Sequence, residues 1–191
     1  MPSSVVLGVI AAVLLFWVVG AYNRLMRLRA EANAAFVGFE AELSRQVALV
    51  RECLPPLEAT QPAALEQGIS FWAGLHGAAA QCAASLAAAR ARPLEYDGIA
   101  ALSAAQDVLS MAWDRAERDD AHDLAGARLP ESVTARRAQL VIQTHAAIDQ
   151  FDRAVNRYNA AIAQFPAVLL AWVFGFKPGR SVRPIGPVAL R

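Results

Sequence analysis

The feature that most constrains the fold is one uninterrupted helical pattern that runs from Val5 to Leu54. Its first part, Val5–Ala21, carries no charged side chain and contains eleven residues of the Val, Ile, Leu and Phe set. No proline interrupts the pattern before Pro55-Pro56, where two rings that cannot donate helical hydrogen bonds end it. The pattern therefore predicts a single long helix that passes from an apolar environment into water.

Residues 5–21 predict a transmembrane helix, preceded by a short exterior segment at residues 1–4. Each large aliphatic residue favours insertion by about 0.3–0.6 kcal/mol at mid-bilayer, and the run approaches the roughly 20 residues that a bilayer needs. The run is followed by Arg24, Arg27 and Arg29. Because cytoplasmic flanks are enriched in arginine and lysine, we expect the N-terminus outside and the following domain in the cytoplasm.

A cleaved signal peptide is the alternative, since Val19-Gly20-Ala21 resembles a small-residue cleavage site. Signal peptides carry their positive charge before the apolar core, whereas this chain carries its arginines after the core. The arrangement favours the uncleaved anchor.

Apolar residues at spacings of three and four predict that residues 22–165 form a cytoplasmic bundle of four helices, at 22–54, 61–91, 98–124 and 131–165. The first stripe consists of Leu25, Leu28, Ala32, Ala35, Phe39, Leu43, Val47, Val50 and Leu54. The last consists of Val141, Thr144, Ile148, Phe151, Val155, Tyr158, Ile162 and Phe165, a pattern typical of coiled-coil-like packing. We place a turn at Asp97-Gly98. The fold class predicted is all-α, with the N-terminal transmembrane helix continuing into an antiparallel four-helix bundle.

An antiparallel bundle returns the end of its fourth helix to the membrane. The apolar segment 166–176 then lies beside Tyr22, with Trp172 as an interfacial anchor; the alternative is a hydrophobic cap on the bundle. The cations expected to form a basic collar at this end are Arg24, Arg27, Arg29, Arg90, Arg92, Lys177, Arg180 and Arg183. Residues 177–191 are expected to form a flexible basic tail.

Three motifs resemble the LemA family. They are Tyr22-Asn23-Arg24-Leu25, then Arg157-Tyr158-Asn159-x-x-Ile162-x-x-Phe165-Pro166, then Leu169-Leu170-Ala171-x-x-Phe174-Gly175-Phe176. The resemblance implies a bacterial inner-membrane protein with a short exterior N-terminus and a cytoplasmic antiparallel helical domain, whose biochemical role is undefined. The alanine-rich first helix and Pro55-Pro56 depart from the family pattern.

The repeated Tyr-Asn pairs also carry a physical hypothesis. Tyr22-Asn23 and Tyr158-Asn159 fall on neighbouring helices near the same end, so the two amides can satisfy polar groups across the helix pair. The alternative is that Tyr158 is an ordinary core residue and Asn23 an interfacial polar residue.

No pattern for catalysis, metal or cofactor binding stands out. Asp119-x-x-His122 occurs once, whereas a di-iron bundle needs two Glu-x-x-His elements. His76 and His145 are expected to be core histidines, and Cys53 and Cys82 apolar fillers. A net charge of +1 excludes a globally basic nucleic-acid binder. We therefore expect no enzyme, no cofactor, no nucleic-acid partner and no small-molecule substrate.

Two function classes remain open. The first is an interaction or scaffold module that binds another protein or self-associates through Phe36, Val37 and Leu49, placed on the exposed side of the first helix. The alternative is a membrane-surface sensor or lipid-binding module that uses the basic collar and residues 167–176. The bilayer is a partner in both. The residues expected at the membrane interface are Tyr22, Asn23, Arg24, Arg27, Arg29, Tyr158, Asn159, Phe165, Pro166, Trp172 and Phe176.

Overall fold

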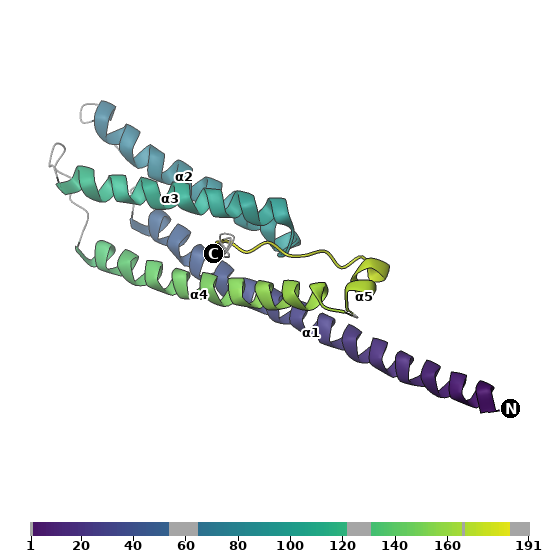
Figure 1. Ribbon diagram of the computed structural model, residues 1–191. Helices are drawn as coiled ribbons and strands as arrows, with labels where there is room; N and C mark the ends of the chain where they lie inside the picture. Colours follow the sequence, from purple (N-terminus) through teal and green to yellow (C-terminus); the bar gives the residue numbers. More distant parts are fainter. Residues whose placement is uncertain (1, 54–64, 122–130, 166, 184–191) are drawn as a thin grey trace, which may run out of the picture.

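The computed structural model describes residues 2–53, 65–121, 131–165 and 167–183, and all regular secondary structure in these ranges is helical. Helix α1 spans Pro2–Cys53, α2 Leu65–Ala91, α3 Tyr96–Ala121, α4 Glu131–Ala163 and α5 Ala167–Phe174. Successive helices from α1 to α4 alternate in direction, and the apolar start of α1 projects beyond the bundle (Figure 1). The predicted antiparallel bundle with a long apolar N-terminal helix is confirmed.

The helix limits differ from prediction at three places. Helix α3 begins at Tyr96, so Asp97-Gly98 starts a helix where we expected a turn. The carboxylate of Asp97 suits the first turn of a helix, where backbone N–H groups point outward. The turn lies just before, where Glu95 N donates to Arg92 O at 3.0 Å. Helix α4 ends at Ala163 instead of 165, and α5 forms a separate helix that we had not predicted. Positions 54, 61–64 and 122–124 of the predicted helices lie outside the described residues.

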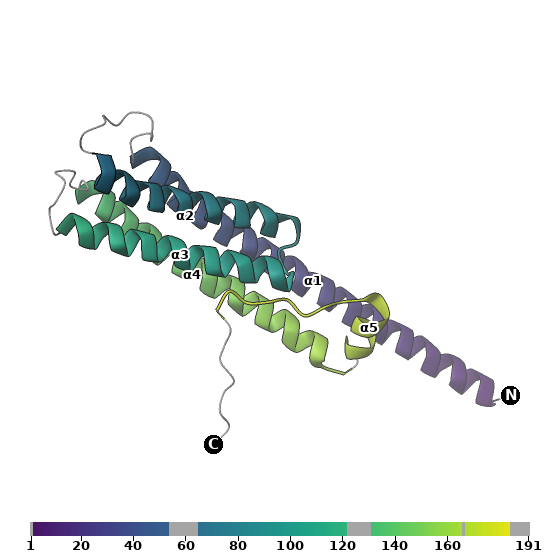
Figure 2. The ribbon, with the colours of Figure 1, turned by 90° about the horizontal axis from the view of Figure 1, so that it is seen from above.

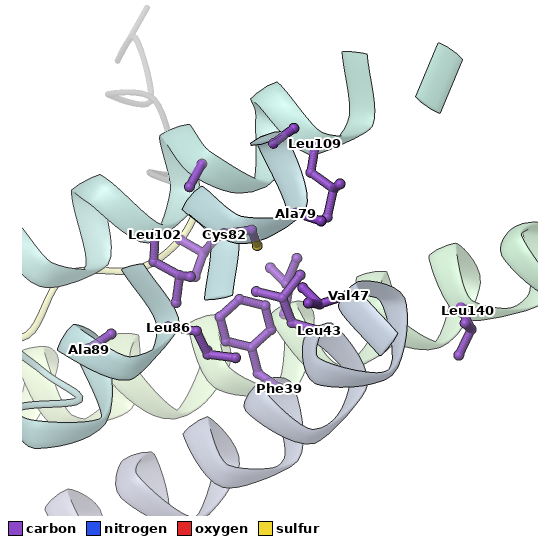
Figure 3. Packing of buried hydrophobic residues seen from close by; sticks show 14 of the residues in the cluster. Phe39, Leu43, Val47, Ala79, Cys82, Leu86, Ala89, Leu102, Leu109 and Leu140 are labelled. Carbon is purple, nitrogen blue, oxygen red and sulfur yellow. The ribbon is translucent and has the colours of Figure 1, made fainter. Parts of the chain in front are cut away.

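Two helix pairs build the bundle, because α1 packs most extensively on α4 and α2 on α3. Aromatic rings fill the α1–α4 contact: the centroid of the Phe151 ring is 5.7 Å from that of Phe36 and 6.2 Å from that of Phe39. Side chains from α1, α2 and α3 meet on the other side of Phe39, among them Leu43, Cys82 and Leu86 (Figure 3). Helix α1 therefore has two neighbours and buries a wider stripe than one seam requires.

This wider stripe corrects one prediction. Phe36 and Leu49, which we placed on a free contact surface, are each 1% exposed in the core. Of the three residues proposed for that surface, only Val37 is exposed, at 62%. The prediction was wrong because the spacing of apolar residues defines the centre of the buried stripe on a helix but not how wide that stripe is.

The chain beyond α5 packs on the bundle. Residues 177–183, the C-terminal strap, run back in extended form along α3 and α4 (Figures 1 and 2). Val182 in the strap is buried in the main core. The expected flexible tail is thus wrong for residues 177–183, and the remainder of that tail, 184–191, lies outside the described residues.

Side chains of both helices hold the strap in place. The Asp152 carboxylate on α4 accepts hydrogen bonds from Val182 N at 2.7 Å and Arg183 N at 3.1 Å. On α3, Ser103 Oγ donates to Val182 O at 3.2 Å, and the Arg180 guanidinium stacks 4.2 Å from the centroid of the Tyr96 ring. Since α3 and α4 make less extensive contact than the two main pairs, the strap joins them.

Candidate functional site at the base of the bundle

The base is the end of the bundle from which the apolar part of α1 projects; it comprises residues 13–29 of α1, the α4–α5 corner at 158–167, and α5 with residues 175–177. Residues 5–17 of α1 are all exposed. In the part of the chain that the structure describes, α1 is the one helix long and apolar enough to cross a membrane. From Val5 to Phe16 its large apolar side chains are exposed, and a continuous exposed apolar surface of this kind is typical of a site of contact with a membrane or another protein.

Helix α5 lies across this base with two different faces. Ala167, Leu170 and Ala171 are buried against a second core cluster that includes Leu25 and Tyr158. The opposite face exposes large apolar side chains: Val168, Leu169, Trp172, Val173 and Phe174. Trp172 is 85% exposed and Val173 64%. The segment therefore caps the bundle with Ala167, Leu170 and Ala171, as one of the two alternatives predicts, and presents its other large side chains outward.

Contacts between aromatic rings determine where along α1 the α4–α5 corner and α5 pack. Phe165 is 73% exposed, so it is not the core residue expected, and its ring centroid lies 5.5 Å from that of Trp17. One turn further along α1, the Tyr22 ring lies 5.2 Å from Phe174 and 6.0 Å from Phe176. Helix α5 thus sits beside the last turns of the apolar segment and the first turn after it.

A positive φ ends α5. Gly175 has φ of 69°, and Phe176 N donates to Ala171 O at 2.9 Å, which is the hydrogen bond of a Schellman motif. This turn brings Phe176 back to Tyr22 and directs the chain into the strap. Glycine adopts such a conformation without the steric cost that a Cβ imposes.

The two Tyr-Asn pairs do not bond to each other. The Asn159 side chain donates to Gly179 O at 2.7 Å and accepts from Gly179 N at 2.8 Å, whereas Asn23 is exposed. Both polar groups of Asn159 therefore serve the strap. Tyr158 is buried, and its hydroxyl donates to Lys177 O at 3.3 Å. Burial raises the pKa of the Tyr158 hydroxyl, an effect that the nearby Arg29 charge opposes.

The basic collar is smaller than predicted. Arg24, Arg27 and Arg29 are exposed at the base, where Arg27 Nε lies 3.7 Å from Glu31 and Arg29 lies over the Phe176 ring. Arg90 instead pairs with Glu40, sixteen residues and so about 24 Å along the helix from Arg24. That separation is about three times the Debye length of about 8 Å at physiological salt, so Arg90 does not belong to the group of cations around Arg24.

The strap also moves a predicted cation away from the base, because Arg183 Nη1 pairs with Asp149 at 3.5 Å partway along α4. Arg92 lies at the α2–α3 turn and pairs with Glu95 at 3.0 Å. Arg29, Arg92 and Lys177 line one shallow cavity of about 420 Å³ at this turn. The predicted cations that lie at the base are Arg24, Arg27, Arg29 and Lys177; Arg92 adjoins it at the α2–α3 turn, and Arg180 stacks on Tyr96 at the start of α3.

Comparisons of this chain with family models, curated proteins and solved structures return no match. The resemblance to the LemA family therefore rests on the three motifs alone.

Other residues singled out in the sequence lie away from the base. His145 is exposed instead of buried, and His76 is partly buried with an Nε2 atom that has no hydrogen-bond partner among the described residues. Cys82 is buried and free, and burial raises the pKa of its thiol to about 11. The described residues contain no group of three or more His, Cys, Asp or Glu placed to hold a metal ion. The side chains of Cys53, Asp119 and His122, together with Pro166, lie outside the description.

The functional residue that sequence reasoning missed is Asp152. A signal for it was present: Asp152 occupies an apolar-stripe position between Ile148 and Val155, four residues after the first and three before the second. An acid at such a position must find buried hydrogen-bond donors, which the strap supplies.

Proposed function

We propose that this protein is a non-enzymatic, single-pass membrane protein whose helical bundle is seated on the lipid surface through α5 and acts there as a lipid-surface module. One observation carries the proposal. The outward face of α5 presents five exposed large apolar side chains directly beside the apolar segment of α1.

Burial of this face in lipid is favourable by a large margin. Fully burying a Val, Leu or Phe side chain is worth about 1.5–3 kcal/mol. Five side chains that are already part-covered by the protein still represent about 5 kcal/mol, or more than a thousandfold in partition. Eight residues are far too few to span a bilayer, so α5 lies in the interfacial zone.

The aromatic residues support this depth. Trp17 and Tyr22 lie where α1 meets the α4–α5 corner and α5, and Trp172 lies on the exposed face of α5. Trp and Tyr are the residues enriched at membrane–water boundaries. With the boundary at this level, Arg24, Arg27 and Arg29 lie just outside the hydrocarbon, where each cation near an anionic surface contributes about 1 kcal/mol.

The orientation follows from the same arginines. Three cations on the bundle side of the apolar segment favour a cytoplasmic bundle and an exterior N-terminus. The LemA resemblance supports a bacterial inner membrane as the location.

Spin labelling of the full chain in lipid nanodiscs tests the seating of α5. A nitroxide is attached at Val173→Cys on α5 and, as the matched control, at Met111→Cys, which is equally exposed on α3. Both variants carry Cys53→Ser, while burial and a pKa of about 11 keep Cys82 unlabelled. We expect the label at 173 to collide more often with oxygen than with a water-soluble nickel chelate, and the label at 111 to show the reverse. Equal nickel access at both positions would remove the proposal.

A scaffold role remains as the second candidate. It now relies on other residues than Phe36 and Leu49: Ile142 is exposed and lies with Val141 beside a groove at the start of α4. Crosslinking from Ile142→Cys in native membranes tests it, and a specific protein adduct that is missing from the Val173→Cys variant would favour this role.

A further inference from the structure

A cleft at the base runs along α1 opposite the α4–α5 corner. It has a volume of about 520 Å³, which lies within the range of small-molecule sites. On the α1 side it is lined by Val13, Phe16, Trp17, Gly20, Ala21, Arg24 and Leu25, and on the other side by Ala161, Gln164, Phe165 and Ala167. All lining residues are apolar except Arg24 and Gln164.

Arg24 lies at the bundle end of the α1 side of the cleft, and Gln164 lies on the opposite side. Arg24 follows Val13 by eleven residues, which corresponds to about 16 Å along the helix axis. The hydrocarbon core of a bilayer is roughly 30 Å thick, so the cleft extends over about the depth of one leaflet. Its apolar part lies at acyl-chain depth, and its cation lies at headgroup level.

Arg24 differs from the other α1 cations in its surroundings. Arg27 pairs with Glu31, and Arg29 lies over the Phe176 ring. Over the described ranges, no carboxylate lies within ion-pair distance of Arg24. An uncompensated guanidinium at the mouth of an apolar cleft is complementary to a phosphate that carries an acyl chain.

The cleft has a gap at Gly20, one of the residues that line it. No atom lies within 4 Å of a Cβ built on Gly20, and the Trp17 and Phe165 rings form a wall beside it. The gap therefore accepts a linear hydrocarbon chain.

We propose that this cleft binds one anionic phospholipid of the leaflet that faces the bundle. Its acyl chain lies against Gly20 and Ala21 beside the Trp17–Phe165 wall, and its phosphate binds Arg24 with the Gln164 amide as a further donor. The inference rests on the seating of the bundle proposed above, and it adds a defined lipid site to that general surface interaction.

Native mass spectrometry of the full chain, released from micelles that contain phosphatidylglycerol, tests the headgroup contact. We expect one retained lipid per chain and about tenfold less retention for Arg24→Gln, because a charge-assisted hydrogen bond is lost. The matched control is Arg27→Gln, which removes the same charge one turn further along α1, at a residue that does not line the cleft. Equal losses in the two variants would overturn the proposal in favour of a general surface charge.

A second variant pair tests the acyl chain. Gly20→Leu fills the cleft and is expected to abolish retention, whereas Gly8→Leu on the same helix is expected to retain the lipid; a Cβ at either position meets no atom within 4 Å. Unchanged thermal melting of both variants confirms that they fold. Retention of the lipid by Gly20→Leu would overturn the proposal. So would a lipid-free dimer of the unaltered chain that Gly20→Leu converts to monomer, because a second copy of α1 would then occupy the cleft.

Failure of this site and failure of the seating give different results. If the label at position 173 stays in lipid while no phospholipid is retained, the cleft proposal alone is wrong. If the label at position 173 is accessible to the nickel chelate in a chain with no substitution in the cleft, the proposed seating of α5 is wrong as well.

Discussion

The C-terminal strap depends on the two hydrogen bonds that Asp152 accepts, and Asp152→Asn tests this directly. Oδ1 accepts from Val182 N at 2.7 Å and Oδ2 from Arg183 N at 3.1 Å. An asparagine keeps the shape of the side chain but offers one acceptor and one donor group. One of the two backbone N–H groups then faces a donor and loses its bond.

The expected cost follows from this geometry. A hydrogen bond to a charged group is worth about 1.5–3 kcal/mol, and removal of a partly desolvated charge offsets part of the loss. We expect the free energy of unfolding to fall by about 2 kcal/mol, which for a chain of this size lowers Tm by about 4–8 °C.

Hydrogen exchange read by mass spectrometry, together with thermal melting in detergent, measures both effects. Faster exchange is expected at Val182 and Arg183, with little change elsewhere. The control is Asp149→Asn, which removes only the exposed pair with Arg183 at 3.5 Å and should cost about 0.5 kcal/mol or less. Equal costs for the two variants, or unchanged exchange in the strap, would refute the role given to Asp152.

The stability difference between the unaltered protein and Asp152→Asn should depend on pH with a defined sign. Burial raises the pKa of Asp152 above its ordinary value of 3.8, and the two backbone hydrogen bonds from Arg183 and Val182 oppose this. A raised folded-state pKa adds a contribution to stability, beyond that of the hydrogen bonds, which is fully present below pH 3.8 and is lost as pH rises through the folded-state value. The difference in unfolding free energy between the unaltered protein and Asp152→Asn should therefore be larger at about pH 3.5 than at pH 7.

Three further predictions concern other parts of the molecule. Gly175→Ala should lower the free energy of unfolding by about 1–2 kcal/mol because the φ of this residue is 69°. Since space for a Cβ is open, the cost comes from the backbone conformation alone, and Gly175→Asn should cost less in the same thermal melt. Thr144→Val should cost about 1–2 kcal/mol, since Gln46 Nε2 loses a 2.6 Å acceptor; Thr144→Ser, which keeps the hydroxyl, is the control. With a thiol pKa of about 11, Cys82 should react with maleimide at least about a hundredfold more slowly than an exposed cysteine, and equal rates by mass spectrometry would contradict its burial.

The sequence by itself was sufficient for the long first helix and the bundle. The α1 stripe through Leu25, Phe39 and Val50 is buried as its spacing predicts, and the same is true of Ile148, Phe151 and Val155 on α4. Helical period is a local property, so residues three and four apart report the buried side of a helix without knowledge of its neighbours. The projecting apolar segment could also be predicted from local properties, because its length and composition alone make it suitable for a membrane.

Tertiary structure decided how wide each buried stripe is and where α5 and residues 177–183 lie. Phe36 and Leu49 are buried because α1 has neighbours on two sides, and Arg90 and Arg183 leave the base because Glu40 and Asp149 hold them. The strap has no regular period, so only its contacts with Tyr96 and Ser103 on α3 and with the carboxylate of Asp152 on α4 determine its path. The cleft at the base likewise exists only because the α4–α5 corner meets α1 at Trp17, a contact between residues almost 150 positions apart.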